Sequence, residues 1–218
     1  MKSNKFTKIV TSIALAASMT MTMVPAVSAS AADYGTATYD TIDTTKTGSM
    51  TIHHYDITAA TKAGVDTSVY NNDGKTDTKA ETELQKYAIQ GTVYSYMKVA
   101  DIYTESKTTT DGVNVRVLYG FNDTNLIGDL GLDTASAELT KNSTYYYTST
   151  EINDALKDKL ENSNTATKNT LEDYIKANGG KDMTETSSTG VTSVDKLPVG
   201  LYMVVETYVP EDVTYTTD

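Results

Sequence analysis

The chain has no cysteine and no tryptophan, and only 3 of its 218 residues are proline and 2 are phenylalanine. Without cysteine the fold contains no disulfide, so its stability must come from a core of ordinary size or from another covalent device. The chain also lacks an excess of positive charge, because its formal net charge is −11. An acidic surface repels phosphate backbones and anionic lipids. Nucleic acids and membrane surfaces are therefore not the expected partners.

The first 31 residues have the layout of a secretory signal peptide. Three lysines precede an apolar run that ends at Pro25, and a stretch of small residues follows. Serines and threonines interrupt the run, which favours a removable signal over a permanent membrane span. Cleavage is expected after Ala29 or Ala31, and it would move the formal charge from −11 to −14 because three lysines and no acid are lost. The mature fragment is predicted to be secreted and to have no stable membrane span.

Tyrosine and threonine are abundant, with 16 and 39 residues. Both suit a half-exposed pleated surface, so the composition favours a mainly β fold. Alternating and β-branched runs predict strands over residues 48–57, 93–103, 113–121 and 197–209. Asp111-Gly112 predicts a turn between the second and third of these strands. Residues 184–195 are predicted to be a loop that leads to the last strand.

A helical insertion is predicted between the third strand and the last. Ile152, Leu156 and Leu160 recur at the four-residue spacing of one helix face, after a possible capping box that runs from Thr148 to Glu151. A second amphipathic segment follows over residues 165–180 and ends at two glycines. Two short helices are therefore expected to cover a sheet edge or the end of a sandwich.

Two ligand-binding motifs are approached in "VYNNDGKTD" but not matched. A phosphate-binding loop needs a glycine five residues before Gly74, and Val69 stands there. A calcium loop with Gly74 in sixth place would begin at Val69 and end at Ala80, neither of which is a calcium ligand. A solvated acidic turn is the preferred interpretation, and no cofactor is predicted.

His53 and His54 are the only two histidines of the chain. Adjacent residues of a strand point to opposite faces, so the pair cannot share one metal ion without a bulge. No serine, cysteine or aspartate is placed near either histidine by a recognisable catalytic motif. No metal site and no catalytic residue are predicted, and an enzyme is not expected.

The order of the sequence blocks resembles a known family. "KTGSMTIHHYD", "QGTVYSYMKVADIY", "VLYGF", the helical insertion and "LPVGLYMVVETYVPEDVTYTTD" together resemble the N-terminal domain of sortase-assembled major pilins of Gram-positive bacteria, the backbone pilins. The resemblance covers residues 48–218, after a polar leader at 32–47. It implies an immunoglobulin-like β-sandwich with a short helical insertion. It also implies that a pilus sortase joins the chain to other pilin subunits at the cell wall.

Two elements of the family pattern are missing from the sequence. No Tyr-Pro-Lys-Asn pilin motif and no Leu-Pro-x-Thr-Gly sorting signal occur before Asp218. "LPVG" is not such a signal, because Gly200 stands where threonine is required and a strand follows, so it is interpreted as a loop that enters this strand. The chain therefore looks truncated at its C-terminal end. The last strand of the sandwich is expected to be missing, which would leave the edge of the final strand open.

Glu206 is the one charged residue in the apolar strand "LYMVVETY". In the related pilin domains a glutamate at this place assists a lysine–asparagine isopeptide bond, and His54 stands where the bonding lysine could be. Since a buried carboxylate without a partner costs several kcal/mol, His54 and Glu206 are predicted to form a buried hydrogen-bonded pair that replaces the covalent bond. The alternative is that Glu206 lies at the wet end of the strand and faces water.

The expected function is that of a structural subunit of a covalently polymerised surface pilus used in adhesion. The alternative is a cell-wall-anchored adhesin whose loops bind a host protein or a carbohydrate, for which many exposed tyrosines and threonines are also suitable. A secreted hydrolase ranks third, because it would need a pocket with convergent polar groups that the sequence does not indicate.

Overall fold

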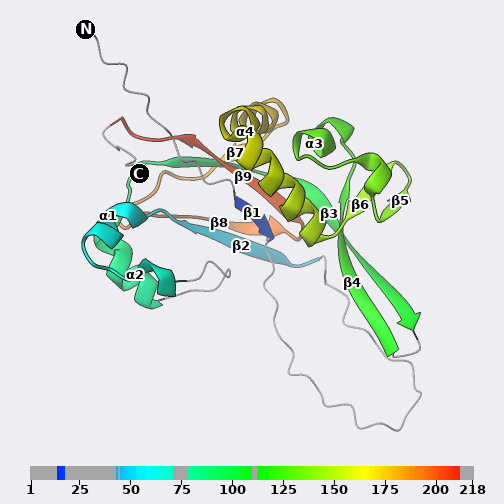
Figure 1. Ribbon diagram of the computed structural model, residues 1–218, viewed down its shortest axis with the longest axis horizontal. Helices are drawn as coiled ribbons and strands as arrows, with labels where there is room; N and C mark the ends of the chain where they lie inside the picture. Colours follow the sequence, from blue (N-terminus) through cyan, green and yellow to red (C-terminus); the bar gives the residue numbers. More distant parts are fainter. Residues whose placement is uncertain (1–13, 18–42, 44, 71–77, 110–111, 212–218) are drawn as a thin grey trace.

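The computed structural model describes residues 14–17, 43, 45–70, 78–109 and 112–211. The fold is mainly sheet, with antiparallel strands in two sheets and a few helices, as Figure 1 shows. The predicted β-rich class is therefore confirmed at this level. The leader at residues 32–42, the acidic turn at 71–77 and the tip of the turn at 110–111 lie outside the described residues.

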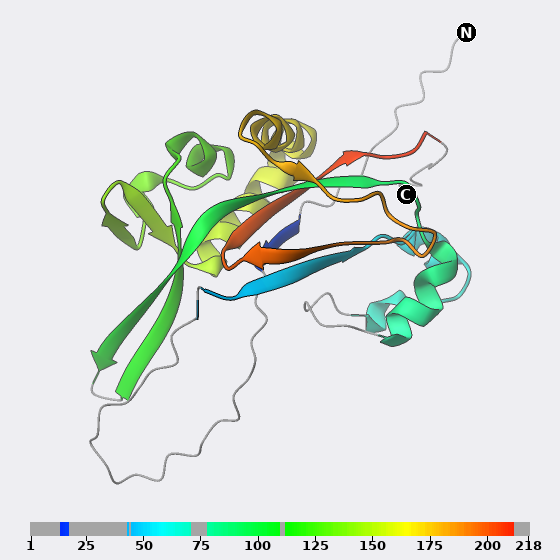
Figure 2. The same cartoon turned by 180° about the vertical axis from the view of Figure 1, so that it is seen from behind.

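The larger sheet has the strand order β1-β9-β3-β4-β6-β5, with β7 also paired to β3. Its strands are β1 (Ala14–Ala17), β3 (Val93–Thr109), β4 (Gly112–Phe121), β5 (Leu139–Lys141), β6 (Thr144–Tyr147), β7 (Lys181–Asp182) and β9 (Leu201–Tyr208). The smaller sheet pairs β2 (Thr47–His53) with β8 (Val191–Pro198). The far halves of β3 and β4 form a two-stranded arm that projects from the body of the molecule (Figure 2).

Four α-helices are described: α1 (Ile57–Lys62), α2 (Thr78–Leu84), α3 (Thr124–Asp129) and α4 (Ser149–Ala177). The predicted capping box of α4 is present, because the Thr148 side chain accepts from the Glu151 N–H and the Glu151 carboxylate accepts from the Thr148 N–H. Two helices were predicted here, and α4 consists of two helical segments that meet at a kink at Ser163, where the backbone is not helical (φ −156, ψ 46). The prediction of two helices is therefore confirmed. None of the described helices is long and apolar enough to cross a membrane.

Strand β9 is buried on both faces. Leu201, Met203 and Val205 belong to a core cluster that also contains Leu171 and Ile175 of α4. Tyr202 and Val204 on the other face belong to a second cluster, with residues of β2 and β8. Strand β9 therefore lies between α4 and the smaller sheet (Figure 1). This double burial explains why its sequence is almost continuously apolar.

Four predicted boundaries are wrong. The second predicted strand was expected to end at residue 103, but β3 continues to Thr109. The first predicted strand ends at His53, because the Asp56 side chain accepts from the Ala59 N–H at 2.8 Å and caps α1. The predicted loop at 184–195 contains five of the eight residues of β8, in which Thr192, Ser193 and Asp195 obscure a strand that pairs with β2. "LPVG" is also split, since Pro198 ends β8 and β9 begins at Leu201.

Gly200 belongs to the turn that carries the chain from the smaller sheet to the larger one. A Cβ atom added at Gly200 would lie 2.3 Å from Cε of Lys98 and 2.9 Å from the carbonyl oxygen of Ala100. The backbone of the turn thus passes so close to β3 that a side chain would not fit. Val199 and Gly200 of "LPVG" form the loop that enters β9, as interpreted, whereas Leu197 and Pro198 belong to β8.

The outer edge of β9 was predicted to be open. In the structure β1 pairs antiparallel with it, from Ala17 opposite Leu201 to Ala14 opposite Val204. The prediction is therefore wrong for this half of the strand. The covering residues belong to the segment that the sequence predicts to be a signal peptide.

Candidate functional site

The carboxylate of Glu206 is buried. The residue is 2% exposed, on the face of β9 that carries Tyr202 and Val204. The alternative in which Glu206 simply faces water is therefore wrong. Its position is fixed by a β-bulge, because Tyr94 of β3 pairs with Glu206 and Val93 pairs with Tyr208, which leaves Thr207 as the extra residue.

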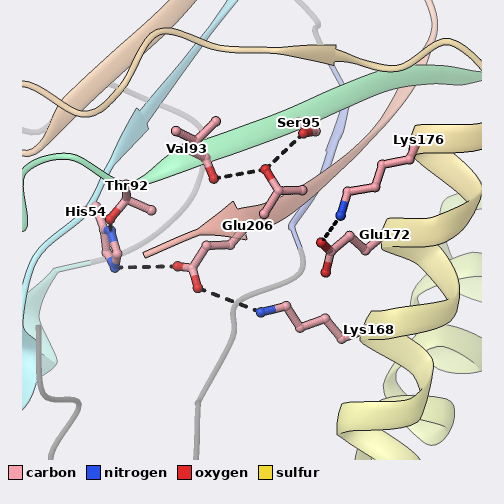
Figure 3. A network of polar contacts seen from close by, with 9 residues as sticks. His54, Thr92, Val93, Ser95, Lys168, Glu172, Lys176 and Glu206 are labelled. Carbon is pink, nitrogen blue, oxygen red and sulfur yellow. Dashed lines mark hydrogen bonds and ion pairs between the residues drawn. The ribbon is translucent and has the colours of Figure 1, made fainter. Parts of the chain in front are cut away.

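The bulge at Thr207 is held by polar contacts of its own. The Thr207 hydroxyl donates to the carbonyl oxygen of Val93 at 3.4 Å and lies 3.0 Å from the hydroxyl of Ser95. The Ser95 hydroxyl also donates to the Asp182 carboxylate at 2.5 Å. This network, drawn in part in Figure 3, fixes the strand beside Glu206 and so directs the carboxylate toward β2.

The structure brings His54 and Glu206 together. Nε2 of His54 lies 3.9 Å from Oε2 of Glu206, an ion-pair separation that is longer than the predicted hydrogen bond. The His54 backbone is held on both sides: its N–H donates to the carbonyl of Gly190 at 2.7 Å, and its carbonyl accepts from the N–H of Ile89 at 3.0 Å. These bonds place the imidazole just after the end of β2, where it faces Glu206 of β9.

The orientation of the imidazole is set by two neighbours, Thr92 just before β3 and Tyr94 near its start. Nδ1 of His54 lies 3.1 Å from the hydroxyl of Thr92, and the ring meets Tyr94 edge-on at 5.8 Å between centroids. Thr92 is fully buried, and its N–H donates to the hydroxyl of Thr186 at 2.9 Å. With Nδ1 facing Thr92, Nε2 faces the carboxylate (Figure 3).

Burial lowers the pKa of His54 below its usual value of 6.5, because the charged imidazolium loses its hydration there. The neutral imidazole is therefore the favoured form at neutral pH. The charge that balances an ionised Glu206 must then come mainly from another residue. The sequence predicted only the histidine as a partner.

That residue is Lys168 of α4. Its Nζ lies 3.9 Å from Oε1 of Glu206, and the two side chains are 14% and 3% exposed. Since α4 packs on the face of β9 opposite to Glu206, the lysine side chain reaches the carboxylate past the outer edge of β9. This crossing lies just beyond Val204, where the pairing with β1 ends. Figure 3 shows the lysine and the histidine on two sides of one carboxylate.

Sequence reasoning missed Lys168. It is one of several lysines in a helix most of whose other charged residues are exposed, such as Lys176, which pairs with Glu172. The available signal was its place beside the buried stripe of Thr167 and Leu171. A lysine at the border of an apolar stripe can lay its stem on the core and carry its ammonium group to a buried acid.

The cluster of His54, Glu206 and Lys168 joins the residue that follows β2 to strand β9 and helix α4, which belong to different layers. Its chemistry is that of a compensated buried carboxylate, with one ammonium and one imidazole at ion-pair distance. Within the described part of the chain, no group of three or more His, Cys, Asp or Glu side chains could hold a metal ion. The arrangement is suited to holding the layers together.

Comparison with known proteins gives no match: no family model, no curated protein and no solved structure is similar to this chain.

Proposed function

We propose that the chain is a structural subunit of a covalently polymerised pilus on the surface of a Gram-positive bacterium, without enzymatic turnover. In this proposal residues 1–31 direct secretion, and residues 48–218 form an immunoglobulin-like β-sandwich of the shaft. A pilus sortase joins the full-length protein to other pilin subunits at the cell wall. No cofactor takes part.

The observation that carries the proposal is the buried cluster of His54, Glu206 and Lys168. The glutamate stands at the place where the resemblance puts the acid beside a cross-link between layers, and an ammonium group from α4 reaches it here. A secreted chain without cysteine has no disulfide to tie its layers. A buried ionic contact between β2, β9 and α4 offers an alternative tie, since breaking a buried pair by removing one partner costs about 3–5 kcal/mol.

The proposal is tested on cells of the source bacterium. Cell-wall extracts are released with a muralytic enzyme, boiled in SDS and blotted with antibodies raised against residues 48–211. A covalent polymer gives a ladder of SDS-resistant bands, and a strain that lacks the pilus sortase gives the monomer alone. A single monomeric band in the parent strain would contradict the proposal.

A second candidate is an adhesin that binds a carbohydrate. The observation in its favour is a pair of partly exposed aromatic rings, Tyr103 of β3 and Tyr146 of β6, whose centroids are 5.1 Å apart. The Tyr146 ring lies across Gly120, where an added Cβ would approach Cε1 at 2.6 Å. Aromatic faces of this kind can stack on sugars, but covering a strand glycine is a sufficient structural role. Binding to a glycan array that is lost in Tyr146→Ala would favour the adhesin.

A further inference from the structure

Two tyrosine rings meet at the base of the arm that β3 and β4 form (Figure 2). Tyr103 of β3 is paired with Leu118 of β4, and Tyr146 of β6 is paired with Gly120 of β4. Paired residues lie on the same face of a sheet, as do residues two apart in one strand, so both rings lie on one face. Strands separated by a third strand are about 9.5 Å apart, yet the ring centroids of the two tyrosines are 5.1 Å apart.

The approach of the rings across β4 depends on Gly120. A Cβ atom at this position would lie 2.6 Å from Cε1 of Tyr146 and 3.0 Å from its Cδ1. The Tyr146 ring therefore occupies the place that a side chain of β4 would take. Cε1, the ring atom closest to the glycine, is ortho to the phenolic hydroxyl. The ortho carbons carry part of the unpaired electron when a tyrosine loses an electron and its phenolic proton.

The arrangement of the two rings is close to that of two rings joined by a bond. The centroids of directly bonded rings are about 4.3 Å apart, so an approach of less than about 1 Å is sufficient. The ring planes of Tyr103 and Tyr146 are tilted by 53°. Two joined phenol rings are also twisted, because their ortho substituents would collide in one plane. Both side chains are partly exposed, so an oxidant can reach them.

The composition makes tyrosine the residue at which one-electron oxidation ends. The chain has 16 tyrosines but no cysteine and no tryptophan, the two other side chains that readily lose one electron. A tyrosyl radical is therefore not passed on to a thiol or an indole, and it persists until it meets a second tyrosyl radical. Methionine reacts with peroxide in a different way, by gaining an oxygen atom.

We propose that Tyr103 and Tyr146 form an oxidative cross-linking site, at which hydrogen peroxide, acting through a haem peroxidase, joins the two rings by a bond between their Cε carbons. Each phenol gives up one electron and one proton, and the two ortho carbons then form the new bond. The hydrogen on each of these carbons moves to the phenolic oxygen, which restores two aromatic phenols. One hydrogen peroxide takes up the two electrons and two protons and becomes two waters.

The new bond ties β3 to β6, two strands that are not paired with each other. It closes the chain between Tyr103 and Tyr146, which contains β4, α3 and β5, into a loop. Such a loop lowers the entropy of the unfolded chain, as a disulfide does in chains that have cysteine. The cross-link thus fastens the base of the arm to the body of the fold. The inference rests on this pair of rings and is independent of the proposed function.

A second pair of tyrosines provides an internal comparison. The ring centroids of Tyr96 and Tyr202 are 6.5 Å apart, so they would need to approach by about 2 Å. Tyr202 is 3% exposed, and its hydroxyl donates to the carbonyl oxygen of Pro198 at 2.8 Å. An oxidant in solution does not reach this ring. Tyr96 and Tyr202 are therefore not expected to couple.

The test treats the full chain, at high dilution, with hydrogen peroxide and a haem peroxidase. Dilution favours coupling within one chain, where the second ring is already close. The oxidised monomer is isolated by gel filtration in denaturant, and its dityrosine fluorescence is measured. Trypsin releases Tyr103 in residues 99–107 and Tyr146 in residues 142–157. Mass spectrometry should find these two peptides joined, with the loss of two hydrogen atoms from their summed mass.

Phenylalanine variants assign the bond to the two rings. Phenylalanine keeps the ring but cannot form a phenoxyl radical, so Tyr103→Phe and Tyr146→Phe should fold like the parent chain and lose the joined peptides. The matched control is Tyr145→Phe. Tyr145 is also partly exposed and lies in the same tryptic peptide, but it is paired with Phe121 and so faces the other side of the sheet. This control should keep the joined peptides.

Free N-acetyltyrosine in a parallel reaction shows that the oxidant is active. If it couples while the monomer yields no joined peptides, the cross-linking site is overturned. Joined peptides that persist in Tyr146→Phe, or that are lost equally in Tyr145→Phe, would also overturn it. Dityrosine confined to products larger than the monomer would show coupling between chains, and the site would be overturned again.

Discussion

Nζ of Lys168 and Oε1 of Glu206 lie 3.9 Å apart although helix α4 and the Glu206 side chain are on opposite faces of β9. The contact is possible because it passes the outer edge of the strand. One buried acid thus connects the helical layer to the smaller sheet, where His54 lies 3.9 Å from its other oxygen. The stability of the layered fold should therefore depend on Glu206 more than on any surface acid.

Glu206→Gln should lower the free energy of unfolding by about 3 kcal/mol, because it leaves the ammonium of Lys168 without its carboxylate in a mostly buried place. Urea unfolding followed by circular dichroism measures the change. The matched control is Glu172→Gln, which breaks the pair of Glu172 with the exposed Lys176 one turn along α4. The control should change stability by less than about 0.5 kcal/mol. Equal effects of the two substitutions would contradict the role of the cluster.

The stability of the protein should fall as the pH drops below about 6.5, in part through His54. Burial lowers the pKa of His54 in the folded state, so the unfolded chain takes up this proton at a higher pH than the folded one. The stabilisation is present above the unfolded pKa and is lost toward acid, with a slope of up to about 1.4 kcal/mol per pH unit for one proton. The groups that face the ring are the Glu206 carboxylate, the Thr92 hydroxyl and the Tyr94 ring.

His54→Gln should flatten this pH dependence between about pH 6.5 and 5, as measured by unfolding at a series of pH values. His53→Gln is the control, since His53 is 33% exposed and pairs with Glu81 at 3.6 Å near the surface. It should leave the slope of the parent chain almost unchanged. The same slope in His54→Gln and in the parent chain would show that His54 takes no part.

Much of the fold could be predicted from the sequence where one local signal decides the structure. The strands around Tyr94 and Val117, the capping box at Thr148 and the burial of one face of α4 follow from alternation, side-chain type and spacing. Strand β8 was missed because Thr192, Ser193 and Asp195, residue types that are also typical of loops, interrupt its apolar residues. Its pairing with β2 is a non-local property that no short window contains.

The candidate site could be predicted only in part, for the same reason. Strand alternation and the resemblance placed His54 and Glu206 on faces that could meet. Lys168 comes from a third element, and its approach depends on how α4 lies on β9 and on where the edge of β9 is open. Neither is encoded in the spacing of residues along the helix.

Gly190→Ala should be among the more destabilising glycine substitutions. Gly190 has φ +74, and an added Cβ would lie 2.5 Å from the carbonyl oxygen of His54 and 3.1 Å from the Cβ of Ala88. The backbone that holds the imidazole must therefore shift. Gly179→Ala is the matched control, with φ +79 and no atom within 4 Å of the added Cβ. The control should cost about 1–2 kcal/mol from backbone strain alone, and Gly190→Ala should cost clearly more in urea unfolding. Equal losses would show that the contact with His54 is not limiting.

The contact between Lys168 and Glu206 that connects the layers should be ionic and reversible, not covalent. An isopeptide bond forms when an uncharged lysine amine attacks the carbonyl carbon of an amide or a protonated acid, with loss of ammonia or water. Lys168 faces the carboxylate of Glu206 at 3.9 Å, and an ionised carboxylate beside an ammonium group is neither a good electrophile nor next to a nucleophile. The position where the resemblance expects a lysine is occupied by His54, whose imidazole cannot form a stable amide.

The intact mass of the purified chain should therefore equal the mass calculated from its sequence, without the loss of one ammonia or one water. Tryptic digestion should release the peptide that carries Lys168 separately from the peptide that carries Glu206. A mass deficit together with a branched peptide joining Lys168 to another segment would show that the ionic cluster is the precursor of a covalent bond.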